Sequence, residues 1–188
     1  MEIKKTTKLH EARFLNLFQR DFANKGKESS WIFCSRENEP APHIKKTPDA
    51  VVIVGVLEGK LVVTSEFRVP IMAREWGFPA GLIEYNEDPR EAAIREFKEE
   101  VGLDFEPTEV SAPNLYSSSG MSNESVQIVF GKAFGIPTTE HNEELEDIQI
   151  HLISQEDIAD MLVKFENNEL AVSDKAWCLF WHFSKVGM

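Results

Sequence analysis

The chain has 188 residues, of which 42% are hydrophobic, and this size and composition predict one catalytic domain with a real core and a small N-terminal addition. The formal net charge of −12 argues against nucleic acid as a partner, because a polyanion would be repelled. No apolar run is long enough to span a bilayer, and residues 1–8 lack the apolar stretch of a signal peptide, so we expect no membrane association and a cytoplasmic location.

The N-terminal quarter predicts a small β element. Residues 10–23 fit a strand and a short helix equally well, whereas residues 30–35 are typical of a strand. A proline-containing loop follows, which predicts a boundary near residues 37–48. We therefore expect an N-terminal β element at 1–45 and a catalytic domain at 46–188.

Strands and helices are mixed in the second region. Two β-branched runs, 50–57 and 60–67, flank Glu58-Gly59 and predict a hairpin. A capping-box pattern at 154–157 begins one helix, and another is expected at about 173–185. Further strands are expected at 80–84, 108–117, 124–134 and 147–153. Packing is the favoured role for the apolar residues of the last helix, which are Ala176, Trp177, Phe180, Trp181 and Phe183.

The cysteines carry no recognisable metal site. Cys34 and Cys178 lie far apart without metal-ligand spacing, which predicts buried, reduced thiols rather than a disulfide.

The best-specified helix is expected between residues 89 and 101. Asp88 and Glu91 form a capping-box pattern around Pro89, and Gly102 provides the stop. The side expected to be buried consists of Ala92, Ala93, Ile94, Phe97 and Val101.

Three glutamates occupy the opposite stripe of this helix, with Arg95 beside them. Glu96, Glu99 and Glu100 fall at helical spacing and would repel one another unless a cation lay between them. A solvated acidic face is the alternative that composition alone leaves open.

The spacing around this helix matches, without departure, the signature of the Nudix hydrolase family. That signature places a glycine, a glutamate, an Arg-Glu pair, an aliphatic or aromatic residue, a Glu-Glu pair, a glycine and an aliphatic residue at fixed separations. Nine specified positions within 23 residues make chance agreement remote. The matching positions are Gly81, Glu87, Arg95, Glu96, Phe97, Glu99, Glu100, Gly102 and Leu103.

This resemblance implies the α/β/α sandwich of the Nudix family, an α/β fold with a mixed sheet between the 89–101 helix and the C-terminal helices. The order of elements alone indicates only an α/β or α+β protein. It also implies hydrolysis of a phosphoanhydride bond with divalent cations, for which carboxylates suit Mg²⁺, with Mn²⁺ as a substitute.

The resemblance further implies the metal ligands. Glu96 and Glu100 are expected to bind the metal directly, and Glu99 to bind an additional ion or to bind through water. The backbone carbonyl of Ala80 completes the set. Arg95, which we count with Glu99 among the catalytic residues, is interpreted as an orienting partner of the glutamates. Arg95 is expected to act through Glu87, to which we assign a structural role.

Outside this motif, the chain resembles the branch of the family that cleaves ADP-ribose and related nucleoside diphosphate sugars. The resemblance lies in residues 61–70 and 75–81, and implies that Arg68 holds the diphosphate and Glu75 a ribose or sugar hydroxyl. A surface ion pair of Arg68 with a neighbouring glutamate is the alternative. The branch usually has proline where this chain has Ser119, which weakens the assignment of the substrate.

An acidic segment at 140–148 precedes a predicted strand. Composition alone favours a solvated loop. In the resembling enzymes a glutamate of this loop is the general base, which aligns with Glu144, and Glu146 aligns with a neighbour that reaches the metal. Glu143 competes with Glu144 for the first role.

The N-terminal element of the resembling enzymes pairs with a second subunit and supplies a platform for the nucleobase. The resemblance therefore implies a homodimer, with Trp31 and Arg36 as base-binding residues. A tryptophan in the core or in a dimer interface is the alternative for Trp31.

The favoured function is Mg²⁺-dependent cleavage of ADP-ribose to AMP and ribose 5-phosphate. GDP-mannose, NADH or a dinucleoside polyphosphate are alternative substrates. A non-catalytic ligand sensor of the same fold is a second reading, which the intact motif and the lack of a basic helix-turn-helix segment oppose.

Overall fold

The computed structural model describes residues 1–41, 43–142 and 147–187. The chain forms two compact units, the first made of residues 1–49 and 112–127 and the second of residues 50–111 and 128–188. The first unit therefore contains a segment from the middle of the sequence. The division into a dimerisation element and a catalytic domain at residues 45 and 46 remains a prediction.

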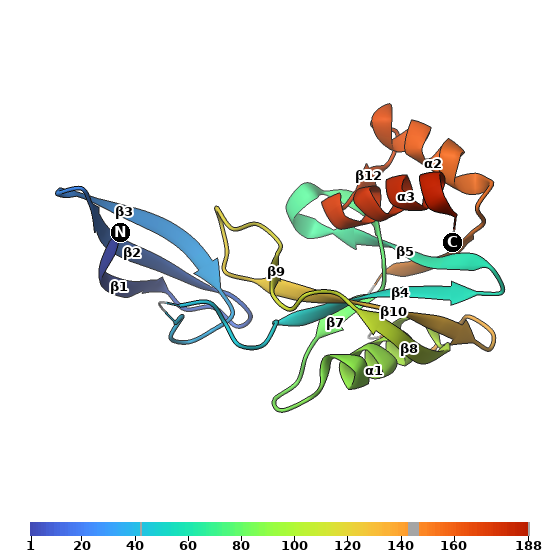
Figure 1. Cartoon of the computed structure of the whole chain (residues 1–188), viewed down its shortest axis with the longest axis horizontal. Coiled ribbons are helices and arrows are strands. Elements are labelled where there is room, and N and C mark those ends of the chain that lie inside the picture. The colour runs from blue at the N-terminus through green and yellow to red at the C-terminus, as the bar shows by residue number, and fades with distance from the viewer. Residues whose placement is uncertain (42, 143–146, 188) are drawn as a thin grey trace. The chain divides into compact units, whose positions relative to one another are not determined.

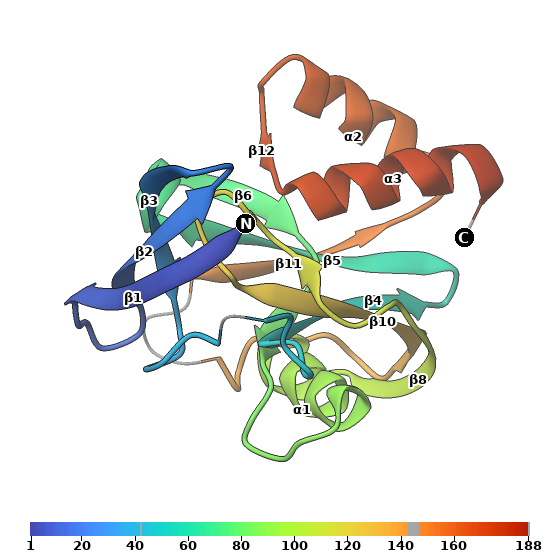
Figure 2. The same cartoon turned by 60° about the vertical axis from the view of Figure 1, so that its left-hand side comes forward.

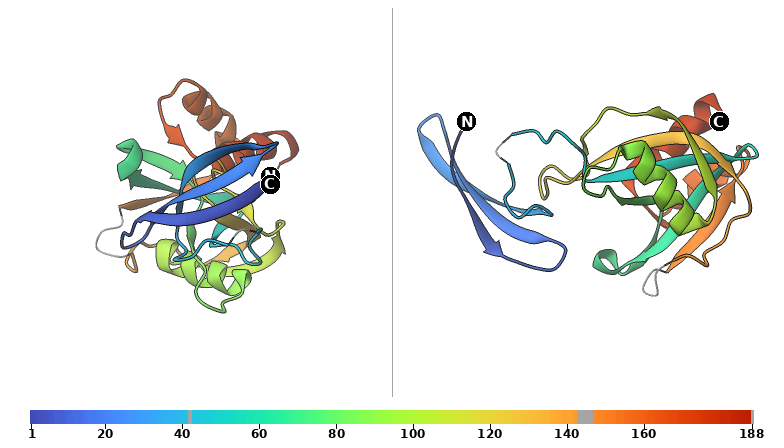
Figure 3. Two further views of the ribbon diagram at one scale, coloured as in Figure 1. Left: turned by 90° about the vertical axis from the view of Figure 1, so that its left-hand side faces the viewer. Right: turned by 90° about the horizontal axis from the view of Figure 1, so that it is seen from below.

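The first unit contains a three-stranded antiparallel sheet, drawn in blue in Figures 2 and 3. The ambiguous segment 10–23 is mainly a strand, and its Phe18 is buried and stacks on Phe33. The strands are β1 (Glu2–His10), β2 (Asn16–Asn24) and β3 (Lys27–Ser35).

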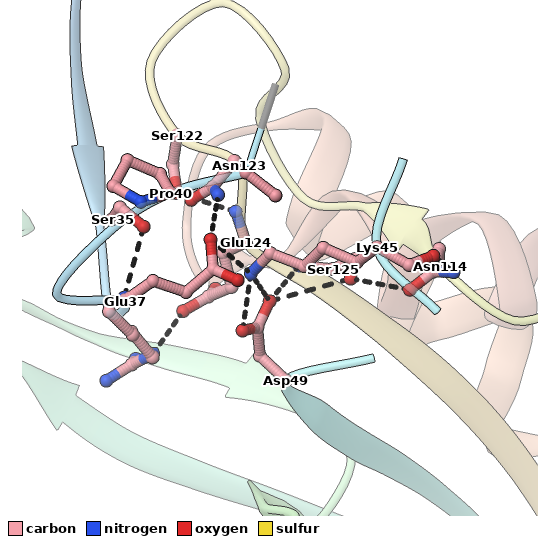
Figure 4. A network of polar contacts seen from close by, with 12 residues as sticks. Ser35, Glu37, Pro40, Lys45, Asp49, Asn114, Ser122, Asn123, Glu124 and Ser125 are labelled. Atoms are coloured by element: carbon pink, nitrogen blue, oxygen red, sulfur yellow. Dashed lines mark hydrogen bonds and ion pairs between the residues drawn. The ribbon is translucent and has the colours of Figure 1, made fainter. Parts of the chain in front are cut away.

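A network of polar side chains holds the loop after β3 (Figure 4). The Lys45 side chain is only 8% exposed, and its Nζ lies 2.6 Å from Asp49 Oδ1. Asp49 Oδ2 accepts the backbone N–H of Ser125 at 2.8 Å, and Ser125 Oγ donates to Asn114 Oδ1 at 3.1 Å. Because a buried charge must be paired to be tolerated, this chain of contacts fixes residues 45–49 beside the 112–127 segment within the first unit.

The large sheet has nine strands and is mixed, since β12 pairs in parallel with β6 while the other recorded pairings are antiparallel. The predicted hairpin at 50–67 is confirmed, with Glu58 and Gly59 both at positive φ in the turn. Six strands lie in the order β12-β6-β5-β4-β10-β8, and β11, β7 and β9 pair with β5, β4 and β10. Their bounds are β4 (Ala50–Leu57), β5 (Lys60–Arg68), β6 (Ala73–Gly77), β7 (Ala80–Leu82), β8 (Asp104–Val110), β9 (Leu115–Tyr116), β10 (Ser125–Phe134), β11 (Ile148–Ile153) and β12 (Ala171–Val172), with a 3₁₀ turn at Val69–Ile71.

Within the described residues, three helices of the second unit cover the large sheet. Helix α1 (Pro89–Val101) lies on one face, and α2 (Asp157–Glu166) and α3 (Asp174–Val186) lie on the other (Figure 1). The core under α1 includes Phe97, which packs on Phe105 with ring centroids 4.8 Å apart. The α/β sandwich with a mixed sheet is therefore confirmed, and it places the glutamate helix directly against β4, β7 and β8.

Some burial predictions were wrong. Ile94 is 43% exposed and Trp181 is 48% exposed. Each directly follows a residue that is buried, and one step along a helix turns the side chain by about 100°. Both side chains thus point away from the centre of the buried stripe.

The cysteine prediction was wrong in part. Both thiols are free, but Cys34 is only half-buried and Cys178 is exposed. Among the described residues, no helix has both the length and the apolarity that crossing a membrane requires.

Candidate active site

Helix α1 begins and ends where the sequence predicts. Asp88 accepts the N–H of Arg90 at 2.9 Å, the Glu91 side chain accepts the N–H of Asp88, and Gly102 ends the helix at φ 71°. These caps fix which residues of the helix face β7.

Gly81 of β7 lies against the first of the helix glutamates. A Cβ atom built on Gly81 would lie 1.9 Å from Glu96 Cδ, so any other residue here would displace the carboxylate from its present position. The glycine of the motif therefore leaves space for the carboxylate of the motif glutamate.

Arg95 connects the acidic residues to one another. Its Nε and Nη2 donate to the two carboxylate oxygens of Glu87, each at 2.9 Å. Its Nη1 donates to Glu96 Oε1 at 2.8 Å and to Glu99 Oε2 at 3.1 Å, and Nη2 also donates to Leu82 O at 3.0 Å. This guanidinium is thus the internal counter-charge of the cluster.

The electrostatics follow from these contacts. Burial raises the pKa of Glu96 above its ordinary value, against the lowering effect of the hydrogen bond from Arg95. The hydrogen bond from Arg95 lowers the pKa of Glu87, and the same bond raises the pKa of Arg95. Glu96 is therefore a desolvated carboxylate that a second cation would stabilise.

The cluster lines a cavity of about 570 Å³ in the second unit. Glu100 Oε2 accepts the backbone N–H of Ala80 at 3.2 Å, so strand and helix meet here as well. His141 also lines the cavity; it lies in the segment 140–148, in which only glutamates were given a role. The lining residues are Ala80, Gly81, Leu82, Glu84, Arg95, Glu96, Glu99, Glu100 and His141.

The donor set of the cavity fits a hard divalent cation. Carboxylate and carbonyl oxygens are the ligands that Mg²⁺ prefers, and three glutamates and Ala80 share the cavity. Within residues 1–41, 43–142 and 147–187, no three acidic, histidine or cysteine side chains are already arranged around a common metal position. The ion pairs with Arg95 account for this, because they hold the carboxylates of Glu96 and Glu99 toward the guanidinium and away from a shared metal position.

The two residues expected to bind the substrate's diphosphate and sugar lie side by side. Arg68 is 49% exposed, and its Nη1 lies 2.9 Å from Glu66 Oε2. Its Nε lies 3.7 Å from Glu75 Oε2, and Glu66 and Glu75 face each other across β5 and β6. The ion pairs that the sequence left as an alternative for Arg68 are therefore present.

Trp31 and Arg36 belong to the first unit. Trp31 is 56% exposed, which rules out a core tryptophan, and its Nε1 donates to Gly120 O at 2.9 Å. It lines a cavity of about 460 Å³ together with Ser119, which stands where the resembling enzymes usually have proline. Arg36 Nε donates to Glu124 Oε2 at 2.7 Å. Glu144 and Glu146, and the competing Glu143, lie outside the described residues.

The comparisons with known proteins agree with this geometry. A family model of the NUDIX domain matches residues 46–173. The chain is 28% identical over 138 residues to the ADP-ribose pyrophosphatase of Bacillus subtilis, with 72% of each chain covered. It is 37% identical over 89 residues to the ADP-sugar pyrophosphatase of Mus musculus, covering 45% of this chain and 40% of the mouse protein.

A solved structure described as an ADP compounds hydrolase has the same fold, with a TM-score of 0.66 at 23% identity over 85% of this chain and 81% of that one. The chain belongs to the Nudix family and is a Nudix hydrolase. Within the family, it resembles the ADP-ribose pyrophosphatase branch.

Proposed function

We propose that the protein hydrolyses the pyrophosphate bond of a nucleoside diphosphate sugar, with ADP-ribose as substrate and AMP and ribose 5-phosphate as products. The observation that carries this proposal is the single cavity lined by Arg95, the three helix glutamates and Ala80. The bacterial relative is an ADP-ribose pyrophosphatase and the mouse relative an ADP-sugar pyrophosphatase, which supports a substrate that contains ADP.

Mg²⁺ is the proposed cofactor, and Mn²⁺ a substitute. Glu96, Glu100 and the carbonyl of Ala80 would hold the first ion, and Glu99 would hold another or bind through water. When bound, the cation neutralises phosphate charge and makes water more acidic. The role of Arg95 is to orient the glutamates, since its guanidinium contacts two of them and Glu87.

Arg68 and Glu75 are the proposed contacts to the diphosphate and the sugar. Arg68 is exposed and its two glutamate partners are half-buried, and the contact of Arg68 with Glu75 is loose at 3.7 Å, so an anionic substrate has only weak ion pairs to displace. Glu144 is the proposed general base and Glu146 an additional metal ligand, on the basis of the sequence resemblance.

For the nucleobase we propose Trp31 and Arg36, with the N-terminal element as the contact in a homodimer. The exposed Trp31 ring and the cavity that it lines support a stacking surface.

A substrate panel tests the proposal. Purified protein with Mg²⁺ is given ADP-ribose, GDP-mannose, NADH and a dinucleoside polyphosphate, and the released phosphomonoester is measured. Fastest turnover of ADP-ribose supports the proposal, and faster turnover of another compound reassigns the substrate. Binding of ADP-ribose without turnover of any compound would instead indicate the ligand-sensor reading.

The base is tested separately with Glu143→Gln, Glu144→Gln and Glu146→Gln. General-base catalysis contributes about 10² to 10⁴ in rate, so Glu144→Gln is expected to lose at least about 100-fold in kcat. A Glu144→Gln rate within about threefold of the wild type would move the role to a neighbouring glutamate. The matched control is Glu166→Gln, which changes an exposed glutamate at the end of α2.

A further inference from the structure

Two carboxylates lie directly opposite each other on neighbouring strands of the second unit. Glu66 of β5 is paired in register with Glu75 of β6. Directly opposed residues of antiparallel strands have Cβ atoms about 4.5 to 5.5 Å apart, and like charges at that separation repel each other. The two side chains are only 25% and 29% exposed, so water screens neither charge completely. This acidic pair, Glu66 and Glu75, therefore needs a cation beside it.

Arg68 supplies the positive charge. It follows Glu66 by two residues in β5, so both side chains project from the same face of the strand. Its Nη1 lies 2.9 Å from Glu66 Oε2, and its Nε lies 3.7 Å from Glu75 Oε2. One guanidinium thus serves two carboxylates, and the three side chains together are anionic.

The acidic pair lies on the face of the large sheet that α1 covers. Strand β5 pairs with β6 and with β11, and Thr64 of β5 is paired with Ile150 of β11. Ile150 packs against the core cluster under α1. Because Thr64 and Glu66 are two residues apart, they project from the same face of the sheet. Glu66, its partner Glu75 and Arg68 therefore share a sheet face with the helix that carries the proposed metal ligands.

We propose that Glu66, together with Glu75, determines which substrates the enzyme accepts. The acidic pair admits a diphosphate whose sugars carry free hydroxyl groups and excludes one whose sugars carry a further phosphate. This inference rests on the proposed function, in which Arg68 holds the diphosphate.

The chemistry of the three side chains supports this selection. Carboxylates accept hydrogen bonds, which suits the hydroxyl groups of a sugar, but they have no donor to offer a phosphate oxygen. The only cation of the group, Arg68, is already shared by both carboxylates. A further phosphate would therefore meet uncompensated negative charge, and such like-charge contacts are a general means of rejecting a wrong partner.

The test compares three compounds that differ by one phosphate. They are ADP-ribose, ADP-ribose with an extra phosphate on the adenosine ribose, and ADP-ribose with an extra phosphate on the terminal ribose. Cleavage of the pyrophosphate bond is measured with Mg²⁺ for the wild type and for Glu66→Gln in the full chain. Glutamine keeps the shape of the side chain and removes its charge, so a change in preference reports the charge alone.

The readout is the ratio of kcat/KM for ADP-ribose to kcat/KM for the phosphorylated compound that the wild type cleaves more slowly. Partly exposed charge pairs typically contribute a factor of about 1.4 to 5, and a phosphate monoester carries nearly two charges, so Glu66→Gln should lower this ratio by about 3- to 10-fold. A loss of folded enzyme would lower both rates equally and leave the ratio unchanged. The matched control is Glu109→Gln, which changes an exposed glutamate of β8 at the other side of the large sheet.

Glu75→Gln should lower the ratio in the same direction, and it keeps the inference testable if Glu66→Gln fails to fold. Equal turnover of all three compounds by the wild type would overturn the inference, as would an unchanged ratio in both variants. In either case, cleavage of ADP-ribose by the wild type would leave the proposed function standing. A wild type that cleaves none of the three compounds would refute the proposed function, and this inference with it.

Discussion

Glu87 and Arg95 form a two-pronged ion pair, with Nε to Oε1 and Nη2 to Oε2 both at 2.9 Å. The remaining guanidinium nitrogen donates to Glu96 and Glu99. Glu87 therefore reaches no metal in the proposed site but fixes the residue that orients two ligands.

Glu87→Gln removes the charge of this pair while keeping its shape. Loss of an outer partner of a metal ligand typically costs about 10- to 100-fold in metal affinity or activity, and we expect a fall in kcat within that range. Arg95→Lys should lower kcat by a similar factor, because lysine cannot form the two-pronged ion pair with Glu87. Steady-state kinetics against the Glu166→Gln control measures both, and rates equal to the control would refute the orienting role.

Gly81→Ala should strongly impair activity. The added Cβ would lie 1.9 Å from Glu96 Cδ, so the carboxylate or the strand must move, and displacement of about 1 Å can cost about 10² in rate. Gly120→Ala is the control, because a Cβ there meets nothing within 4 Å. If both alanine variants retain wild-type turnover, the close contact of β7 with Glu96 has no role in catalysis.

Gly102→Ala should destabilise the fold through two effects. Its positive φ disfavours a side chain by about 1 kcal/mol or more, and the added Cβ also collides with Thr138. Gly26→Ala shares the positive φ, at 77°, but meets nothing within 4 Å. Urea unfolding should show a larger loss in the free energy of unfolding for Gly102→Ala than for Gly26→Ala. Equal losses would mean that contact with Thr138 contributes nothing.

His151 should make stability depend on pH. Its Nε2 lies 2.8 Å from Ser65 Oγ and its ring stacks on Trp76 at 4.0 Å. Burial, and secondarily the charge of Arg74, lower the pKa of His151 below the ordinary 6.5. The neutral ring is therefore favoured in the folded state, and its contribution is fully present above that pH and lost as pH falls through the folded pKa.

The free energy of unfolding should accordingly fall less between about pH 7 and pH 5 in His151→Gln than in the wild type. His182→Gln, at an exposed site on α3, should keep the wild-type dependence. Parallel pH profiles for wild type and His151→Gln would contradict the assignment.

Local features of the fold could be predicted from the sequence, because helix caps and hairpin turns depend on neighbouring residues. The limits of α1 and the turn at Glu58-Gly59 are examples. The grouping of residues 112–127 with the N-terminal unit could not be predicted, since it depends on contacts between distant positions such as Asp49 and Ser125.

The same distinction applies to the candidate site. Glycine and glutamate spacing identified the cavity residues on β7 and α1, because one helix and one turn bring them together. The segment 140–148 was singled out for its glutamates, but His141 was missed, since only tertiary structure places it beside the cavity. Trp181 was misjudged because hydrophobicity alone does not fix which side of a helix faces the core.

We propose that the protein hydrolyses ADP-ribose at this cavity, with a divalent cation held by the helix glutamates. The most direct measurement is AMP release from ADP-ribose, with and without Mg²⁺, by the wild type and by Glu100→Gln. We predict Mg²⁺-dependent release by the wild type and nearly none by a folded Glu100→Gln variant. Equal metal-dependent turnover by both proteins would contradict the assignment of the site.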